Sequence, residues 1–176
     1  MRVIAGSRKG HRIAAPKGRD TRPTSDRVRE NTFNLIGPVD GANVLDLFAG
    51  SGALGIEALS RGAATAVFVD RSRRAIDAIR ANLDALDIEA DVRPLEARAA
   101  LRAASARREA YDLVFLDPPY RRAAELGREL SEGLAAVLAP GARVITESDR
   151  RVPLELDLPL ADERRYGDTV IRIHEP

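Results

Sequence analysis

The stretch Val44-Leu-Asp-Leu-Phe-Ala-Gly-Ser-Gly-Ala-Leu-Gly55 decides the fold class. Residues 44–48 are predicted to form a short buried strand, and residues 53–61 a helix that ends at Gly62. The glycines between them allow the backbone to approach a ligand where a Cβ atom would clash. The following helix offers free N–H groups to a carboxylate or phosphate. Gly50, Gly52 and Gly55 match the G-x-G-x-x-G pattern of dinucleotide-binding loops.

Strands and helices alternate through most of the remaining chain. The apolar pattern predicts strands at 65–69, 91–93, 111–116 and 142–146, with helices at 72–86, 97–108 and 122–138 between them. Two late strands, 154–158 and 169–173, have no helix between them and are expected to form an antiparallel hairpin. We therefore predict an α/β fold with a doubly wound, mainly parallel, seven-stranded Rossmann-like sheet whose last strand is antiparallel. Ligands of such sheets bind beyond the carboxyl ends of the strands.

The amino-terminal part of the chain differs from the rest in its predicted elements and in its charge. Short strands at 3–5 and 12–14 flank turn residues, and a helix is expected to begin at 24–26 and to end before Gly37-Pro38. Residues 1–36 hold nine basic and three acidic residues, a formal charge of +6, whereas the rest of the chain carries −5. We expect a basic extension over residues 1–40, which approaches a polyanion, and a second domain over residues 41–176.

Composition excludes several classes of protein. The 176 residues are 44% hydrophobic and 31% charged, as in globular proteins, and contain no cysteine and only two histidines. Disulfide frameworks and thiolate chemistry are therefore excluded, and no metal site is expected. No apolar stretch is long enough to span a bilayer, and the start lacks a signal peptide, so we expect a cytoplasmic protein with no membrane partner.

Two further features point to chemistry at the strand ends. Asp70 follows the second predicted strand, 20 residues after Gly50, where a carboxylate can hold a ribose diol. With the glycine loop, it fits either NAD(P)H or S-adenosylmethionine. Asp117-Pro118-Pro119-Tyr120 directly follows the strand at 111–116. The prolines leave carbonyl acceptors free, Asp117 adds a carboxylate, and the ring of Tyr120 can stack on a base. This set suits a planar amine such as a nucleobase amino group.

Together the two motifs resemble those of amino-group methyltransferases that use S-adenosylmethionine. Within that class the chain resembles the RsmD family, which methylates the 2-amino group of a guanine in small-subunit ribosomal RNA. The resemblance covers nearly the whole chain and is carried by residues 22–30, Phe33-Asn34, 44–63, 117–120 and 166–169. Asn31-Thr32 departs from the family, which usually has apolar residues there.

The resemblance implies a role for each candidate residue. Asp46, Phe48, Gly50 and Gly52, with Ala49 and Ser51 of the same loop, would line the methionine part of the cofactor. Asp70 would take the ribose hydroxyls, and Glu96 and Ala97 would meet the adenine edge. Asp117, Pro118, Pro119 and Tyr120 would hold the target guanine. Arg22, Arg27 and Arg29 would contact RNA phosphates or brace the extension on the body. The expected partner is 16S ribosomal RNA in a partly assembled small subunit, bound by a monomer.

Three other interpretations remain open. DNA amino-group methyltransferases share Asp-Pro-Pro-Tyr, but the 56 residues after Tyr120 leave no room for a separate DNA-reading domain. An NAD(P)-dependent oxidoreductase fits the glycine pattern and leaves residues 117–120 and the basic extension unexplained. A noncatalytic RNA-binding module would not need both motifs.

Overall fold

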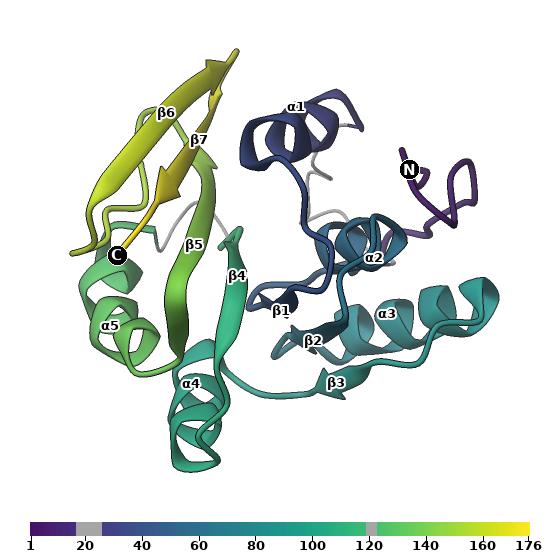
Figure 1. The fold of residues 1–176 in the computed structure, drawn as a ribbon, viewed down its shortest axis with the longest axis horizontal. Helices are drawn as coiled ribbons and strands as arrows, with labels where there is room; N and C mark the ends of the chain where they lie inside the picture. The colour runs from purple at the N-terminus through teal and green to yellow at the C-terminus, as the bar shows by residue number, and fades with distance from the viewer. Residues whose placement is uncertain (17–25, 119–122) are drawn as a thin grey trace.

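The computed structural model describes residues 1–16, 26–118 and 123–176, and in them a seven-stranded sheet lies between layers of helices (Figure 1). The strands are β1 (Asn43–Asp46), β2 (Thr65–Val69), β3 (Asp91–Arg93), β4 (Tyr111–Leu116), β5 (Leu138–Asp149), β6 (Leu160–Tyr166) and β7 (Thr169–His174). The helices are α1 (Asp26–Ile36), α2 (Ala53–Ser60), α3 (Arg73–Leu86), α4 (Ala97–Ala106) and α5 (Ala123–Ala135). None of these helices is long and apolar enough to cross a membrane.

The sheet confirms the predicted fold class. Its strand order is β3-β2-β1-β4-β5-β7-β6. The pairs from β3 to β5 are parallel, whereas β7 runs antiparallel to both β5 and β6. The order reverses direction at β1, so the crevice expected for a ligand lies between the carboxyl ends of β1 and β4.

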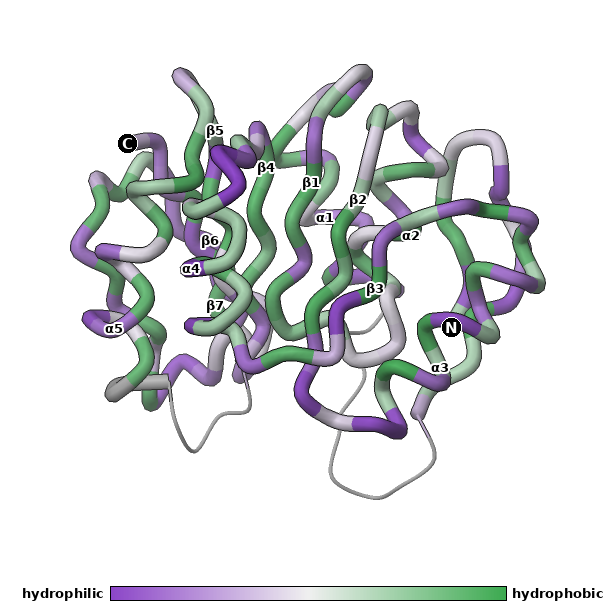
Figure 2. The backbone as a smooth tube through the Cα atoms, turned by 90° about the horizontal axis from the view of Figure 1, so that it is seen from below, coloured by the Kyte–Doolittle hydropathy of each residue, from purple (hydrophilic) through white to green (hydrophobic). Residues whose placement is uncertain are grey.

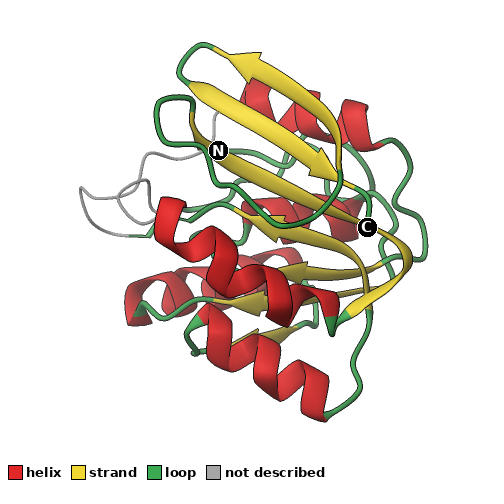
Figure 3. Ribbon diagram, turned by 90° about the vertical axis from the view of Figure 1, so that its left-hand side faces the viewer, coloured by secondary structure: helices red, strands yellow, loops and turns green. Residues whose placement is uncertain are grey.

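Side chains that alternate along the strands pack into two separate hydrophobic clusters, one on each face of the sheet. Phe68 of β2 belongs to the cluster that includes Ile56 of α2 and Ile79 of α3. Its neighbour Val67 belongs to the other cluster, with Leu101 of α4 and Leu130 of α5. Helices accordingly cover both faces (Figure 3), and hydrophobic strands fill the centre of the molecule (Figure 2). This double coverage explains why the central strands are almost continuously apolar.

The prediction of a strand at 154–158 was wrong. Leu154 is fully buried and Leu156 and Leu158 pack against the α4–α5 cluster, so the alternation reflects burial without strand pairing. Two backbone donors of this segment bond to serine side chains instead: Leu154 N–H to Ser148 Oγ (3.1 Å) and Asp157 N–H to Ser131 Oγ (2.9 Å).

The true edge strand is β6, whose sequence Leu-Ala-Asp-Glu-Arg-Arg-Tyr is too polar to be found by hydrophobic alternation. Charged residues are usual on an edge strand, where they discourage pairing with other chains. The predicted helix at 122–138 is also shorter, since α5 ends at Ala135, and β5 extends well beyond the predicted 142–146 in both directions.

The amino-terminal segment forms a small hairpin, as predicted. Arg2 and Arg12 form an antiparallel bridge, and the Val3 N–H donates to the His11 carbonyl at 2.9 Å. Val3 and Ile13 are buried in the same cluster as Phe33 of α1. The hairpin and α1 therefore share a hydrophobic core with the α2–α3 face of the sheet.

Candidate cofactor and catalytic site

The loop after β1 is joined to the strands on both sides. Asp46 at the end of β1 is level with Phe68 of β2 and Phe115 of β4. Beyond it, the Leu47 N–H donates to the Phe115 carbonyl (3.1 Å), and the Ala49 N–H donates to the Val69 carbonyl (3.0 Å). The segment predicted to hold the cofactor is therefore fixed between β2 and β4 at the carboxyl edge of the sheet.

The glycines of this loop serve two different purposes. Gly50 has φ 54°, and the nearest heavy atom to an added Cβ would be the Phe48 carbonyl oxygen at 3.9 Å. The left-handed backbone conformation at Gly50 favours glycine, and the missing side chain leaves open space beside the loop. Gly55 is different, because an added Cβ would lie 2.3 Å from Cε1 of Phe68. The third glycine of the pattern thus allows α2 to pack closely on the sheet.

Asp70 holds the loop in place. One carboxylate oxygen accepts the Gly50 N–H at 3.0 Å, and the other accepts the Ser72 N–H at 2.8 Å. Each carboxylate oxygen has a further lone pair with which it can accept a ribose hydroxyl. The residue predicted to bind the ribose is therefore also the residue that fixes the conformation at Gly50.

Asp46 is a buried carboxyl group beside this loop. Its side chain accepts the Gly55 N–H at 3.2 Å. Burial, opposed by the Gly55 hydrogen bond and assisted by the charge of Asp70, raises the pKa of Asp46 to about 7. A cationic group placed beside Asp46 would favour its ionised form. The methionine ammonium and sulfonium of S-adenosylmethionine are such groups.

The remaining predicted cofactor residues lie on the same edge with different exposures. Phe48 and Ser51 are half-buried, Ala49 and Ala97 are buried, and Glu96 is exposed. Glu96 precedes α4 and pairs with Arg71, with 3.2 Å between Arg71 Nη1 and Glu96 Oε1. This ion pair joins the loops that follow β2 and β3, where an adenine edge is expected.

The structure describes half of the predicted catalytic motif. Asp117 is half-buried and Pro118 is buried, and both directly follow β4. Pro119 and Tyr120 lie outside the described residues, as does Arg22. Asp46 thus ends β1, and Asp70 and Asp117 directly follow the adjacent strands β2 and β4, so the three residues lie at one edge of the sheet.

The arginines predicted to contact RNA differ in their exposure to solvent. Arg27 is exposed on α1. Arg29 is fully buried and donates to Asp26 (3.1 Å) and to the Arg2 carbonyl. It also lies 3.7 Å from the carboxylate of Glu57. Of the two roles expected for Arg29, phosphate contact or bracing, this geometry fits bracing, and burial keeps it from reaching a phosphate.

Glu57 of α2 was missed by the sequence analysis. Its fully buried carboxylate accepts the backbone N–H groups of Ile4 (2.8 Å) and Ala5 (3.0 Å) and pairs with Arg61 (2.7 Å). With Arg29, Glu57 joins the hairpin, α1 and α2. The only signal in the sequence is a single acidic residue in an otherwise apolar helix.

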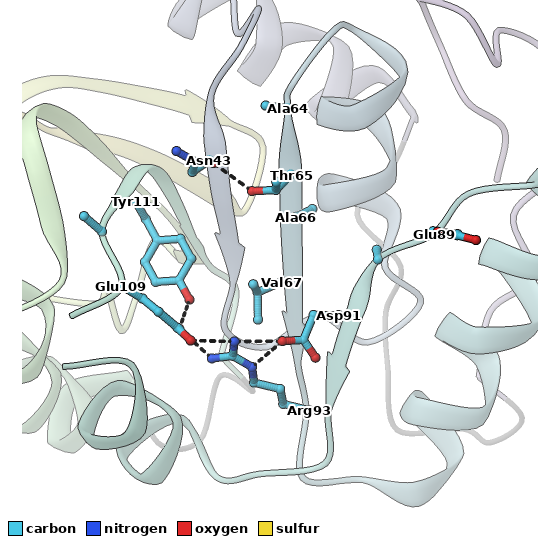
Figure 4. A pocket seen from close by; sticks show the side chains of 12 residues that line it. Asn43, Ala64, Thr65, Ala66, Val67, Glu89, Asp91, Arg93, Glu109 and Tyr111 are labelled. Atoms are coloured by element: carbon cyan, nitrogen blue, oxygen red, sulfur yellow. Dashed lines mark hydrogen bonds and ion pairs between the residues drawn. The ribbon is translucent and has the colours of Figure 1, made fainter. Parts of the chain in front are cut away.

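A groove of about 470 Å³ lies at the opposite, amino edge of the sheet (Figure 4). Three of its charged residues form one cluster: Arg93 pairs with Glu109 (2.8 Å) and Asp91 (2.7 Å), and the Tyr111 hydroxyl donates to Glu109 (2.6 Å). The Arg93 and Tyr111 hydrogen bonds lower the pKa of Glu109 to about 2. This cluster ties β3 to β4 and lies away from the loops described above.

Comparison with known proteins identifies the family of the chain. The family model described as Conserved hypothetical protein 95 matches residues 1–175. The putative rRNA methyltransferase YlbH of Bacillus subtilis is 42% identical over 186 residues, which covers 99% of this chain and 98% of that protein. Ribosomal RNA small subunit methyltransferase D of Escherichia coli is 40% identical over 123 residues, 69% of this chain and 61% of that protein.

Solved structures extend the similarity to the whole fold. The putative methyltransferase yhhF of Escherichia coli superposes with a TM-score of 0.82 at 34% identity, over 99% of this chain and 97% of that chain. A hypothetical protein of Thermus thermophilus has a TM-score of 0.86 at 30% identity, over 100% and 99% of the two chains. The chain therefore belongs to the family described as Conserved hypothetical protein 95, the RsmD family of S-adenosylmethionine-dependent methyltransferases.

Proposed function

We propose that this protein transfers a methyl group from S-adenosylmethionine to the 2-amino group of a guanine in small-subunit ribosomal RNA. One observation carries the proposal: the Asp117-Pro118 segment follows β4, and the loop held by Asp70 follows the adjacent strand β1. An amine acceptor and a cofactor loop are thus side by side. The names of the relatives, rRNA methyltransferases of the small subunit among them, support the same chemistry.

The residues at the edge fit the cofactor. The left-handed backbone at Gly50 leaves space, Asp70 offers acceptors for a ribose diol, and Asp46 offers a carboxylate to a cation. When bound, S-adenosylmethionine supplies a methyl group made electrophilic by the sulfonium. The task of the protein is to orient the amine and to strengthen its lone pair.

In this proposal Asp117 and the Pro118 carbonyl carry out this task. Acceptors that hold both amino hydrogens would localise the nitrogen lone pair for attack on the methyl group that S-adenosylmethionine supplies, with S-adenosylhomocysteine as the leaving group. The methylated amine would then lose one proton to Asp117 or to water. Catalysis by alignment and fixed charges needs no covalent intermediate on the protein.

The hairpin is the proposed RNA-facing surface. Arg2, Lys9 and Arg12 are exposed, and none of them has an acidic partner within the described residues. Exposed arginines of the carboxyl-terminal strands do have such partners, as in the pair Arg165–Glu163 (2.9 Å). Unpaired cations are available to phosphates, so we assign RNA binding to the extension over residues 1–40 and include Arg27. A monomer bound to a partly assembled small subunit is part of the same proposal.

Methyl transfer from tritiated S-adenosylmethionine to 16S ribosomal RNA, naked or in small-subunit particles, tests the function. Asp117→Asn keeps the size of the side chain and removes its charge, so we expect the rate to fall about 10²-fold or more. RNA and cofactor affinity should change little. The matched control is Asp84→Asn, at an exposed position of α3, which should retain full activity.

Three results would contradict the proposal. The first is an Asp117→Asn variant that turns over at the wild-type rate. The second is calorimetric binding of NADH in place of S-adenosylmethionine, which would favour an oxidoreductase. The third is methylation of duplex DNA in preference to RNA, which would point to the DNA alternative.

A further inference from the structure

Strand β5 continues past the end of β4 and brings a second carboxylate level with Asp117. Leu116, the last residue of β4, pairs with Thr146 of β5. The next residues along the chain are Asp117, which directly follows β4, and Glu147, which still lies within β5. On its other side Glu147 pairs with Ile171 of β7, so the sheet fixes its position. Glu147 is only 7% exposed, which is unusual for a glutamate.

Side-chain alternation assigns the two carboxylates to one face of the sheet. Phe115 and Ile145 belong to the hydrophobic cluster that contains Phe33 of α1, whereas Leu116 belongs to the opposite cluster. Because side chains alternate along a strand, residues two positions after Phe115 and Ile145 return to the α1 face. Those residues are Asp117 and Glu147. Ile171, the β7 partner of Glu147, lies in the α1 cluster too.

Two carboxylates on adjacent strands match the hydrogen-bonding edge of guanine. Guanine presents its N1–H and its 2-amino group side by side, both as donors. Neighbouring strands lie about 4.8 Å apart, a spacing that lets two acidic side chains converge on adjacent donors of one base. A base whose N1 is an acceptor would leave a buried carboxylate facing a lone pair, which is costly.

We propose that Glu147 is the residue that selects guanine, by accepting its N1–H while Asp117 accepts the 2-amino group. This inference rests on the proposed function, because it assigns a second contact to the same target base. It separates the selection of the base, assigned to Glu147, from activation of the amine, assigned to Asp117. A site built to accept a hydrogen bond rejects an analogue without the donor by large factors.

The test compares guanine with 2-aminopurine, which keeps the 2-amino group but has an acceptor at N1. The methylated guanine is first located with wild-type protein by nuclease digestion and mass spectrometry. Ribosomal RNAs ligated to carry guanine or 2-aminopurine at that position, naked or reconstituted into small-subunit particles, are then compared by kcat/KM. We expect wild-type protein to prefer guanine about 10²-fold or more. In Glu147→Gln the amide can donate to N1, so the preference should narrow at least tenfold.

Controls separate specificity from folding. Glu132→Gln, at an exposed position of α5, should keep the wild-type preference. Glu147→Asp retains the carboxylate, so its methyl-transfer rate should fall while its preference for guanine is kept. If Glu147→Gln does not fold, Glu147→Asp takes its place in the comparison. Calorimetric binding of S-adenosylmethionine confirms an intact cofactor site in each variant.

Two outcomes would overturn the assignment of Glu147. One is an unchanged guanine preference in folded Glu147→Gln, and the other is wild-type protein that accepts both bases equally. Absence of methylation of any RNA by the wild-type protein is a different result, because it would overturn the proposed function itself.

Discussion

At the scale of single residues, the buried carboxyl group of Asp46 leads to a prediction about cofactor binding. Burial raises its pKa to about 7, so without a nearby cation the carboxyl is substantially protonated below that pH. Binding of a cationic cofactor should ionise Asp46 and release a proton. We predict that affinity for S-adenosylmethionine increases as the pH rises from about 5.5 to about 7.5, with proton release that calorimetry in buffers of different ionisation enthalpy detects. Asp46→Asn should bind more weakly and lose this pH dependence.

The same residue makes a prediction about stability. A carboxyl group whose pKa is raised by folding stabilises the folded state at low pH, and that contribution is lost as the pH rises from about 4 to about 7. The melting temperatures of Asp46→Asn and the wild type should therefore be closer at about pH 5 than at about pH 8. At about pH 8 the Asp46→Asn variant should have the higher melting temperature. A constant difference in melting temperature across this range would contradict the shifted pKa.

At the scale of elements, Glu57 joins the hairpin, α1 and α2. Its buried carboxylate accepts two hairpin N–H groups and faces the buried Arg29. Removing one partner of a buried ion pair typically costs about 3–5 kcal/mol. We predict that Glu57→Gln lowers the free energy of unfolding by about this amount in denaturant titrations, and that amide exchange of Ile4 and Ala5 accelerates.

An exposed ion pair provides the matched control for Glu57. Glu129 of α5 pairs with Arg98 of α4 at 3.2 Å, with both side chains exposed. Glu129→Gln should lower the free energy of unfolding by less than about 1 kcal/mol. Similar losses in the two variants would show that Glu57 does not organise the amino-terminal segment.

At the scale of the whole molecule, the charge is unevenly distributed. Residues 1–36 carry +6 and the rest of the chain −5, and the exposed cations without acidic partners among the described residues include Arg2, Lys9 and Arg12 of the hairpin. Each phosphate contact on single-stranded RNA contributes about −0.7 to the slope of log affinity against log salt. Changing these three residues together to Ala should flatten the slope by about one to two units in filter-binding titrations.

A control variant removes as much charge elsewhere. Arg107, Arg164 and Arg165 are exposed and paired with acidic side chains, so their joint change to Ala should leave the slope unchanged. Cofactor affinity should stay at the wild-type value in both triple variants, because the cofactor loop is at the carboxyl edge of the sheet. Equal slopes in the hairpin variant and the wild type would place the RNA-binding surface elsewhere.

The sequence by itself determined the parts of this protein whose signals are local. The strand, glycine loop and helix at 44–61 are contiguous, and the parallel topology places Asp46, Asp70 and Asp117 at one edge whatever the details of packing. The sequence pattern predicted a strand at the buried leucines of 154–158 and missed the polar edge strand β6. Hydrophobic alternation indicates which residues are buried, and a segment can be buried without pairing as a strand.

The tertiary structure alone decided the environments that depend on distant contacts. Arg29 looks like any basic residue of the extension, and only the packing of α1 and the hairpin on α2 buries it beside Glu57. Glu147 gives no signal in sequence, because its proximity to Asp117 follows from the register of β5 on β4. Burial and register are properties of residues far apart in the chain, so charge and spacing in the sequence do not specify them.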